Sequence, residues 1–195
     1  MSSTRKKLKA RVVILSGPSG AGKTTLHDRL LSSPRWKGRV VRSVSATTRK
    51  PRGKERHGRE YLFLSPRMFA YKARTGQFLE WARVFDHCYG TPMKAVRENL
   101  RQGRSVLLCI DVQGARAVRR RIPKALSIFV QTPTMKELER RLKGRGTDPA
   151  EAIRLRLKTA AKEMKEAPRY DQVIVNDDLD RAFRDLETVL ERELL

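Results

Sequence analysis

The segment Gly17-Pro18-Ser19-Gly20-Ala21-Gly22-Lys23-Thr24 constrains the fold of this chain more than any other segment. It satisfies G-x-x-x-x-G-K-[ST] at every fixed position, which is the pattern of a loop that wraps the β and γ phosphates of a nucleotide. An apolar run of strand length precedes it at residues 12–15, and residues 25–31 place Leu26, Leu30 and Leu31 on one helical face. Strand, glycine loop and helix in this order predict a phosphate site at the start of an α/β domain.

The residue types of this loop explain the expected chemistry. Glycine lets the backbone N–H groups point inward without a Cβ clash, and these groups form an anion cradle with the N-terminus of the following helix. Lys23 adds a positive charge toward the β and γ phosphates, and the Thr24 hydroxyl is a candidate ligand for Mg²⁺. The loop therefore predicts a nucleoside triphosphate, but it does not identify the acceptor.

Length and composition favour one globular domain in the cytoplasm. The chain has 195 residues, 39% of them hydrophobic and 33% charged. No apolar run approaches the roughly 20 residues that span a bilayer, so no membrane association is expected. Cys88 and Cys109 have neither the spacing of a metal site nor that of a disulfide framework, and a reducing compartment is the expectation. Nothing in the sequence indicates the oligomeric state.

The net charge of +23 raises the question of nucleic-acid binding. The charge is concentrated in residues 1–54, where Asp28 is the one acidic residue, whereas acids outnumber bases in residues 167–195. A basic region of this kind can contact phosphates without sequence specificity. However, no aromatic residues are interleaved for base stacking, and no helix-turn-helix or zinc pattern occurs. A nucleotide-processing enzyme also requires positive charge, so we do not expect nucleic acid to be the partner.

The rest of the chain alternates strand-like and helix-like segments, which predicts a mainly parallel sheet covered by helices. Further strands are expected at residues 40–41, 106–110, 126–130 and 173–175, and helices at about 92–102, 112–121, 134–144 and 178–193. Residues 43–91 interrupt this rhythm with an Arg/Gly/Pro loop, a short strand at 61–64, a helix after Pro66 and a strand at 78–85. We expect a small, mostly antiparallel insertion here and a mobile basic tail at residues 1–9.

Two features of the insertion suggest a second anion site. Arg49 and Arg52 lie three residues apart in a loop that Pro51 stiffens, and guanidinium groups bind phosphate through two hydrogen bonds. Glu80 interrupts an apolar strand, where a carboxylate requires a partner or a ligand, and it can accept two N–H bonds from the edge of guanine. The ordinary alternatives are a solvated basic loop and a surface-facing glutamate, and these residues alone do not decide between the two interpretations.

A set of motifs in order resolves this ambiguity: GPSGAGKTTL, VSATTRKPR, REY, FLEWARV, YGTP, IDVQGA, RLKGRGTD and VIVNDDLD. With these motifs the chain resembles guanylate kinases, which transfer the γ-phosphate of ATP to GMP, from about residue 10 to residue 190. The resemblance implies a P-loop three-layer α/β core (residues 10–42, 92–133 and 169–190), a GMP-binding insertion (43–91) and a helical lid (134–168). It also implies ATP and Mg²⁺ as cosubstrate and cofactor, and GMP, with dGMP, as acceptor.

The resemblance further implies roles for individual residues. The phosphate of GMP would be held by Ser45, Arg49, Arg52, Tyr61 and Tyr89, whereas Glu80 and Thr91 would read the guanine. Glu55 would sit beside the arginine loop, and Asp111 would lie near the nucleotide sugar and Mg²⁺ at the end of its strand. Residues that resemble those acting on the transferring phosphoryl group are Lys23, Arg49, Arg141, Arg145 and Arg156. ATP would contact the glycine loop together with Asn176 and Asp177.

Some positions depart from the family pattern, and two alternative functions remain at this stage. Cys109 stands where family members usually carry an acid, and the extra residue Lys54 makes the position of Glu55 less certain. Related domains without activity bind phosphorylated peptides in the acceptor pocket, although this chain keeps Lys23 and Arg49, which such domains tend to lose. A kinase for a different phosphorylated acceptor is the other alternative.

Overall fold

The computed structural model describes residues 9–84, 86–144 and 149–195. Its centre is a parallel five-stranded sheet in the order β2-β7-β1-β8-β9. The strands are β1 (Val12–Ser16), β2 (Val40–Arg42), β7 (Ser105–Cys109), β8 (Leu126–Gln131) and β9 (Gln172–Val175). Each of the five strands expected from the apolar runs is present, within one residue of the expected bounds at most ends.

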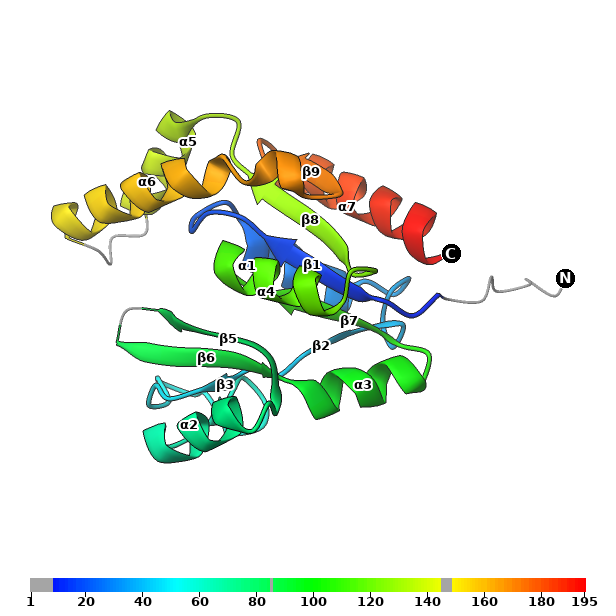
Figure 1. Ribbon diagram of the computed structural model, residues 1–195. Helices are drawn as coiled ribbons and strands as arrows, with labels where there is room; N and C mark the ends of the chain where they lie inside the picture. The colour runs from blue at the N-terminus through cyan, green and yellow to red at the C-terminus, as the bar shows by residue number, and fades with distance from the viewer. Residues whose placement is uncertain (1–8, 85, 145–148) are drawn as a thin grey trace, which may run out of the picture.

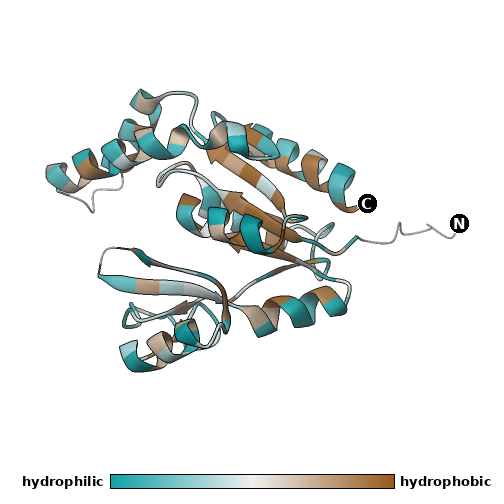
Figure 2. Cartoon of the chain, in the orientation of Figure 1, coloured by the Kyte–Doolittle hydropathy of each residue, from teal (hydrophilic) through white to brown (hydrophobic). Residues whose placement is uncertain are grey.

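Helices cover both faces of this sheet, which gives three layers (Figure 1). Alternate side chains of a strand point to opposite faces, so Val13 and Leu15 pack against α1 (Lys23–Ser32) and α7 (Leu179–Leu194). Val12 and Ile14 pack on the other side against α3 (Met93–Arg101) and α4 (Val112–Arg121). Figure 2 shows the resulting apolar central strands between amphipathic helices.

Residues 46–92 form a second, smaller sheet in the order β4-β3-β6-β5. Its strands are β3 (Ala46–Thr47), β4 (Leu62–Phe63), β5 (Phe78–Val84) and β6 (His87–Pro92), and α2 (Pro66–Arg74) packs against it through Phe69. The pairs β3–β6 and β5–β6 are antiparallel and β3–β4 is parallel, so the insertion is mostly antiparallel as expected. Strands β3 and β6 were not expected, because β3 is two residues long and β6 is polar.

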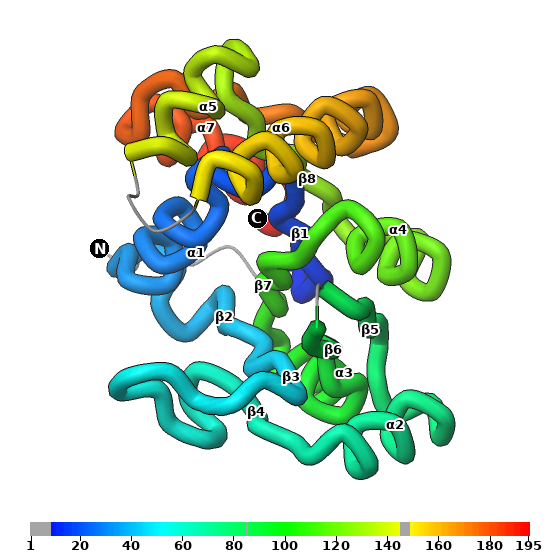
Figure 3. The backbone as a smooth tube through the Cα atoms, turned by 90° about the vertical axis from the view of Figure 1, so that its left-hand side faces the viewer, coloured from blue at the N-terminus to red at the C-terminus, as the bar shows by residue number. Residues whose placement is uncertain are grey.

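Helices α5 (Met135–Lys143) and α6 (Ala150–Met164) lie on the side of the central sheet opposite the small sheet (Figures 1 and 3). Their own apolar cluster contains Leu138, Leu142 and Ala160. A short 3₁₀ helix (Ala167–Arg169) connects α6 to β9. The loop of residues 17–22 therefore lies between two peripheral units, one on each side.

The described part of the chain begins at residue 9, the last residue of the expected basic tail. Residues 1–8 of the predicted tail lie outside the described residues. The backbone N–H of Lys9 donates to the carbonyl oxygen of Leu194 at the end of α7, at 2.8 Å. The described part of the chain contains no helix that is long and apolar enough to cross a membrane.

Candidate active site

The glycine loop connects β1 to α1, and its backbone conformation requires glycine at several positions. Gly17, Gly20 and Gly22 have φ values of 135°, 92° and 92°, which L side chains rarely adopt. A Cβ at Gly17 would lie 2.0 Å from the Val130 carbonyl oxygen. Gly22 also caps α1 without a side-chain hydrogen bond, so the first N–H groups of the helix face the loop. This geometry is that of an anion cradle.

Lys23 curls back over the loop that precedes it. Its Nζ donates to the carbonyl oxygens of Gly17 and Pro18 at 2.7 and 2.8 Å. The ammonium group is thus held at the mouth of the cradle by the loop backbone. Such a position places a positive charge beside any phosphate that the loop N–H groups accept.

Asn176 supports the loop from behind. Its side chain is 3% exposed, and Nδ2 donates to the Ala21 carbonyl oxygen at 2.8 Å. A Cβ at Gly22 would lie 2.1 Å from the same nitrogen. Asn176 therefore fixes the shape of the loop, which the sequence alone did not indicate, whereas its predicted contact with ATP stays a prediction. Asp177, the next residue, is exposed at the end of β9.

Arg49 is the buried cation of the second predicted site. It is 7% exposed, and its NH1 and NH2 donate to Glu55 Oε2 and Oε1 at 2.9 and 2.8 Å. The guanidinium also lies 5.3 Å from the ring centroid of Tyr61 and 6.0 Å from that of Phe63. The hydrogen bonds to Glu55 raise the pKa of Arg49 and lower that of the Glu55 carboxyl. Arg49 is therefore held rigid and charged.

Glu55 lies where the resemblance placed it, beside the arginine loop, despite the inserted Lys54. Besides Arg49 it binds the backbone N–H of Arg52 at 2.8 Å, while the Arg52 side chain is exposed. Glu55 thus closes the loop around Arg49. Tyr61 and Tyr89 lie next to Arg49, and the centroids of the two tyrosine rings are 6.0 Å apart.

Glu80 is buried on β5, with 6% of the residue exposed. Thr91 on the neighbouring strand donates its hydroxyl to Glu80 Oε1 at 2.5 Å. Burial raises the pKa of Glu80 to about 7, and the nearby Asp111 carboxylate adds to this rise, while the bond from Thr91 opposes it. A carboxylate held at such a position is poised to accept hydrogen bonds from a ligand.

Asp111 begins α4, and its Oδ1 accepts the Gly114 N–H at 2.8 Å. A Cβ on Gly114 would lie 3.0 Å from Glu80 Oε2 and 3.2 Å from Asp111 Oδ1, so the absence of a side chain at Gly114 leaves room for both carboxylates. Sequence reasoning missed Gly114, although it belongs to the IDVQGA motif.

Five of the nine predicted acceptor residues line one cavity of about 280 Å³. Its lining includes Ser45, Tyr61, Glu80, Tyr89 and Asp111. A smaller neighbouring cavity of about 140 Å³ shares Ser45 and Tyr61 with it and extends to Thr24 and Asp28 at the start of α1. The predicted acceptor site and the helix that follows the glycine loop are therefore joined. Thr91 lines the smaller cavity, whereas Arg49, Arg52 and Glu55 lie in the adjoining loop.

Cys109 lies at this junction, at the end of β7. Burial raises the pKa of its thiol, and the Thr24 hydroxyl and the Lys23 charge act in the opposite direction. The thiol is thus neutral and next to the predicted Mg²⁺ ligand Thr24. Asp28, one helical turn beyond Thr24, brings a carboxylate to the same cavity and was not singled out from the sequence.

The predicted lid cations occupy different environments. Arg141 on α5 donates to Glu137 Oε1 at 2.8 Å and to the Asn176 carbonyl oxygen at 2.9 Å. Arg156 on α6 is half-buried, whereas Arg154 on the same helix is exposed. Arg145 lies outside the described residues.

Glu163, near the C-terminal end of α6, was also missed by sequence reasoning. Burial raises the pKa of the Glu163 carboxyl. The charge of Lys23 lowers this pKa and that of Asp111 raises it, so this end of α6 lies near both residues. No sequence pattern distinguishes Glu163 from the other charged residues of α6.

Comparisons with known proteins agree with this geometry. The guanylate kinase family model matches residues 9–193. A guanylate kinase of Myxococcus xanthus is 47% identical over 93% of this chain and 86% of its own length, and one of Nitratidesulfovibrio vulgaris is 48% identical over 94% and 87%. The crystal structure of guanylate kinase from Anaplasma phagocytophilum superimposes with a TM-score of 0.77 at 33% identity, covering 97% of this chain and 88% of that one.

Proposed function

Because this chain belongs to the guanylate kinase family and is an ATP-dependent kinase of GMP, we propose that the small sheet binds GMP and the glycine loop binds ATP. The observation that carries this assignment is the buried Glu80–Thr91 pair, which shares a cavity system with Thr24 at the start of α1. Acceptor and donor then meet between the two units. No covalent intermediate is needed, since such transfer depends on positioning and charge stabilisation.

On the donor side, the N–H groups of residues 17–22 and the N-terminus of α1 hold the ATP phosphates. Lys23 exchanges its bonds to the Gly17 and Pro18 carbonyls for the β and γ phosphate oxygens. Asn176 keeps the loop in shape during this exchange through its bond to Ala21. Asp177 is exposed beside it and is our candidate for a contact with the nucleoside part of ATP.

Thr24 is our candidate for the Mg²⁺ contact. Mg²⁺ prefers oxygen ligands and is commonly bound by one or two protein groups plus substrate phosphates. The surroundings fit this mode, because Thr24 supplies a hydroxyl and Asp28 lines the same cavity with a carboxylate. Within the described ranges, no group of three or more His, Cys, Asp or Glu side chains could hold a metal ion. When bound, the ion neutralises the phosphate oxygens.

On the acceptor side, we propose that Glu80 and Thr91 read the guanine while Arg49, Arg52, Ser45, Tyr61 and Tyr89 hold the phosphate. Guanine presents two N–H donors to one carboxylate, whereas adenine presents an acceptor at the corresponding ring nitrogen. Glu80 in its ionised form therefore favours guanine. Glu55 acts as a positioning residue, since its contacts are to Arg49 and the Arg52 backbone.

The lid, assigned to residues 134–168, completes the site on the other side. Arg141 and Arg156 lie on α5 and α6, and Glu163 lies near Lys23. We propose that the two arginines stabilise the charge on the transferring phosphoryl group, which requires cations that arrive together with both substrates. Closure of such a lid also excludes water and so limits hydrolysis of ATP.

An acceptor panel tests the assignment. With ATP and Mg²⁺, the wild-type protein should phosphorylate GMP and dGMP and leave AMP and UMP nearly unreacted. Glu80→Gln should lose most of the preference for GMP over AMP, because the amide offers a donor where guanine also donates. If the ratio of kcat/KM for GMP and AMP were the same in both proteins, guanine would be read elsewhere.

The unpaired cysteines and the nucleotide substrates support a cytoplasmic location for this protein.

A further inference from the structure

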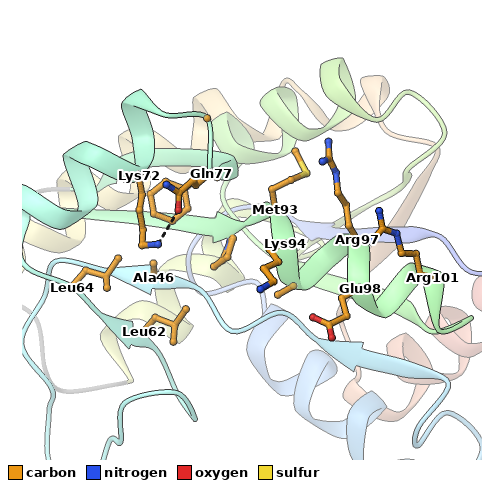
Figure 4. A pocket seen from close by; sticks show the side chains of 14 residues that line it. Ala46, Leu62, Leu64, Lys72, Gln77, Met93, Lys94, Arg97, Glu98 and Arg101 are labelled. Atoms are coloured by element: carbon orange, nitrogen blue, oxygen red, sulfur yellow. Dashed lines mark hydrogen bonds between the residues drawn. The ribbon is translucent and has the colours of Figure 1, made fainter.

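A large groove lies on the back of the small sheet, and Figure 4 shows it in close-up. It measures about 990 Å³ and lies between β4, the turn after α2, and α3. Its apolar lining is mainly aliphatic and consists of Ala46, Leu62, Leu64, Phe78, Pro92, Met93 and Ala95. We call it the back groove. Its volume lies at the upper end of the range of about 300–1,000 Å³ that small-molecule sites occupy.

The back groove is separate from the acceptor cavity, although the two lie on the same sheet. Successive side chains of a strand face opposite sides, so Leu62 and Leu64 line the groove. Tyr61 and Phe63, which alternate with them, lie next to the Arg49 guanidinium on the other face. A ligand in the groove would therefore not overlap with GMP.

The rim of the groove is strongly basic. Lys94, Arg97 and Arg101 line it from α3 with helical spacing, which places three cations along about 10 Å of one helix. All three are exposed, and none of them makes an ion pair with any residue that the structure describes, Glu98 included. Lys72 adds a fourth cation at the opposite rim, where it donates to Gln77 at 2.9 Å.

Some exposed arginines elsewhere pair with acids, as Arg29 does with Asp180 at 2.6 Å and Arg169 with Glu166 at 3.0 Å, whereas the cations of α3 leave their charge open to a ligand. At the back groove, four cations face a single acid, Glu98, next to an apolar floor. The surface thus complements a ligand that is negatively charged at one end and apolar at the other.

We propose that the back groove binds a small free organic anion with an alkyl body and a carboxylate or phosphate head. The alkyl body would cover Leu62, Leu64 and Met93, and removing these apolar surfaces from water favours binding. The head would meet Arg97 and Lys94, where charge-assisted hydrogen bonds form. Both parts are required: neither an inorganic anion nor an uncharged alkyl compound satisfies the whole groove.

The probe for this site is the fluorescent anion 8-anilinonaphthalene-1-sulfonate, measured with the full chain in the presence of saturating GMP and ADP. We expect an enhanced fluorescence component that decanoate displaces and that inorganic phosphate and 1-octanol at the same concentration do not. The double variant Lys94→Ala/Arg97→Ala should weaken this component about tenfold or more, the factor that corresponds to about 1.4 kcal/mol. Ala95→Trp, which fills the groove without a change of charge, should abolish it.

The matched control is Arg184→Ala, which removes an exposed cation from α7 far from the groove in sequence. It should leave probe binding unchanged, and all variants should keep the wild-type circular dichroism and GMP kinase activity, which separates loss of the groove from loss of folding. Loss of the probe component when saturating GMP and ADP are added, unchanged binding in Ala95→Trp, or equal displacement by phosphate and decanoate would each overturn the proposal.

Two other occupants are distinguished by further measurements. If sedimentation velocity shows a dimer that the Lys94→Ala/Arg97→Ala variant dissociates, a second copy of the chain covers the groove and the proposal is wrong. If the protein co-sediments with phosphatidylglycerol vesicles through the same two residues while monomeric decanoate fails to displace the probe, the groove contacts a membrane surface, and the proposal is equally overturned.

Discussion

Glu55 holds the guanidinium of Arg49 through two parallel hydrogen bonds, at 2.8 and 2.9 Å, and the pair lies beside the acceptor cavity. Arg49 is 7% exposed and its other contacts are to neutral groups such as the Lys50 carbonyl oxygen, so without Glu55 it would be a buried cation that has lost this acidic partner. The carboxylate therefore fixes both the charge and the direction of the residue that we propose contacts the GMP phosphate.

We expect Glu55→Gln to raise the KM for GMP about tenfold while the KM for ATP changes little. The amide offers one acceptor and no charge, so Arg49 loses its bidentate partner, and a charge-assisted bond contributes about 1.5–3 kcal/mol. Steady-state kinetics with each substrate varied separately measures the effect. Glu60→Gln is the matched control, because Glu60 lies in the same loop but its side chain contacts the Arg56 backbone N–H and Arg59. A similar rise in KM for ATP would contradict a specific role.

Glu80 should make the stability of the ligand-free protein depend on pH. Burial raises its pKa from 4.5 to about 7, so between these values the folded state binds more protons than the unfolded state. The free energy of unfolding contributed by Glu80 is therefore highest below pH 4.5 and falls as the pH rises to 7, by about 3 kcal/mol at most.

Urea denaturation of the wild type and of Glu80→Gln at pH 5 and pH 8 measures this contribution of Glu80 to the free energy of unfolding. Glutamine keeps the shape and an acceptor for Thr91 but does not titrate. The variant should thus gain stability relative to the wild type as the pH rises. A difference between the two proteins that stays constant with pH would show that Glu80 ionises normally.

Gly114→Ala should impair GMP binding even though alanine favours helices. The new Cβ would lie 3.0 Å from Glu80 Oε2 and 3.2 Å from Asp111 Oδ1, so the Glu80 carboxylate must move. We expect the KM for GMP to rise several-fold and more than that for ATP. In the Glu80→Gln background the same change should have a smaller effect, because residues in contact are not additive. Equal effects in both backgrounds would contradict the contact.

Asn176→Ala should weaken the donor side instead. It removes the buried hydrogen bond to the Ala21 carbonyl and leaves that oxygen without this partner, which costs about 1–3 kcal/mol of unfolding free energy. The loop also loses a support, so the KM for ATP should rise while the KM for GMP remains close to that of the wild type. Steady-state kinetics with each nucleotide varied separately measures the KM values, and thermal unfolding measures the loss of stability. Weaker GMP binding with unchanged ATP binding would place the function of Asn176 elsewhere.

The fold could be predicted from the sequence where the pattern was local. The apolar runs at β1, β7 and β8 are long enough to identify buried parallel strands, and Gly17, Gly22 and Lys23 identify the loop. Strands β3 and β6 could not be predicted, because Ala46–Thr47 is two residues long and His87–Pro92 is polar. Both depend on pairing with strands distant in the sequence.

The supporting residues of the site were harder to find for the same reason. Glu80 stood out because a carboxylate interrupts an apolar strand, but its contact with Gly114 spans 34 positions and leaves no local signal. The role of Asn176 depends on a bond to Ala21 across 155 residues. Glu163 is one of several charged residues on α6, and the position of α6 over Lys23 is what distinguishes it.

Arg156 on α6 is a cation of the proposed lid. Arg156→Ala should lower kcat at least 100-fold with little change in either KM, since a cation that acts on the transferring phosphoryl group contributes about 10³–10⁵ in rate. Arg154→Ala is the matched control: it lies on the same helix but is exposed, whereas Arg156 is half-buried, and its loss should leave kcat within about twofold. Single-turnover measurements at saturating GMP and ATP separate the chemical step from product release. If both variants lost rate equally, the effect would come from the stability or charge of α6, and Arg156 would have no specific role in phosphoryl transfer.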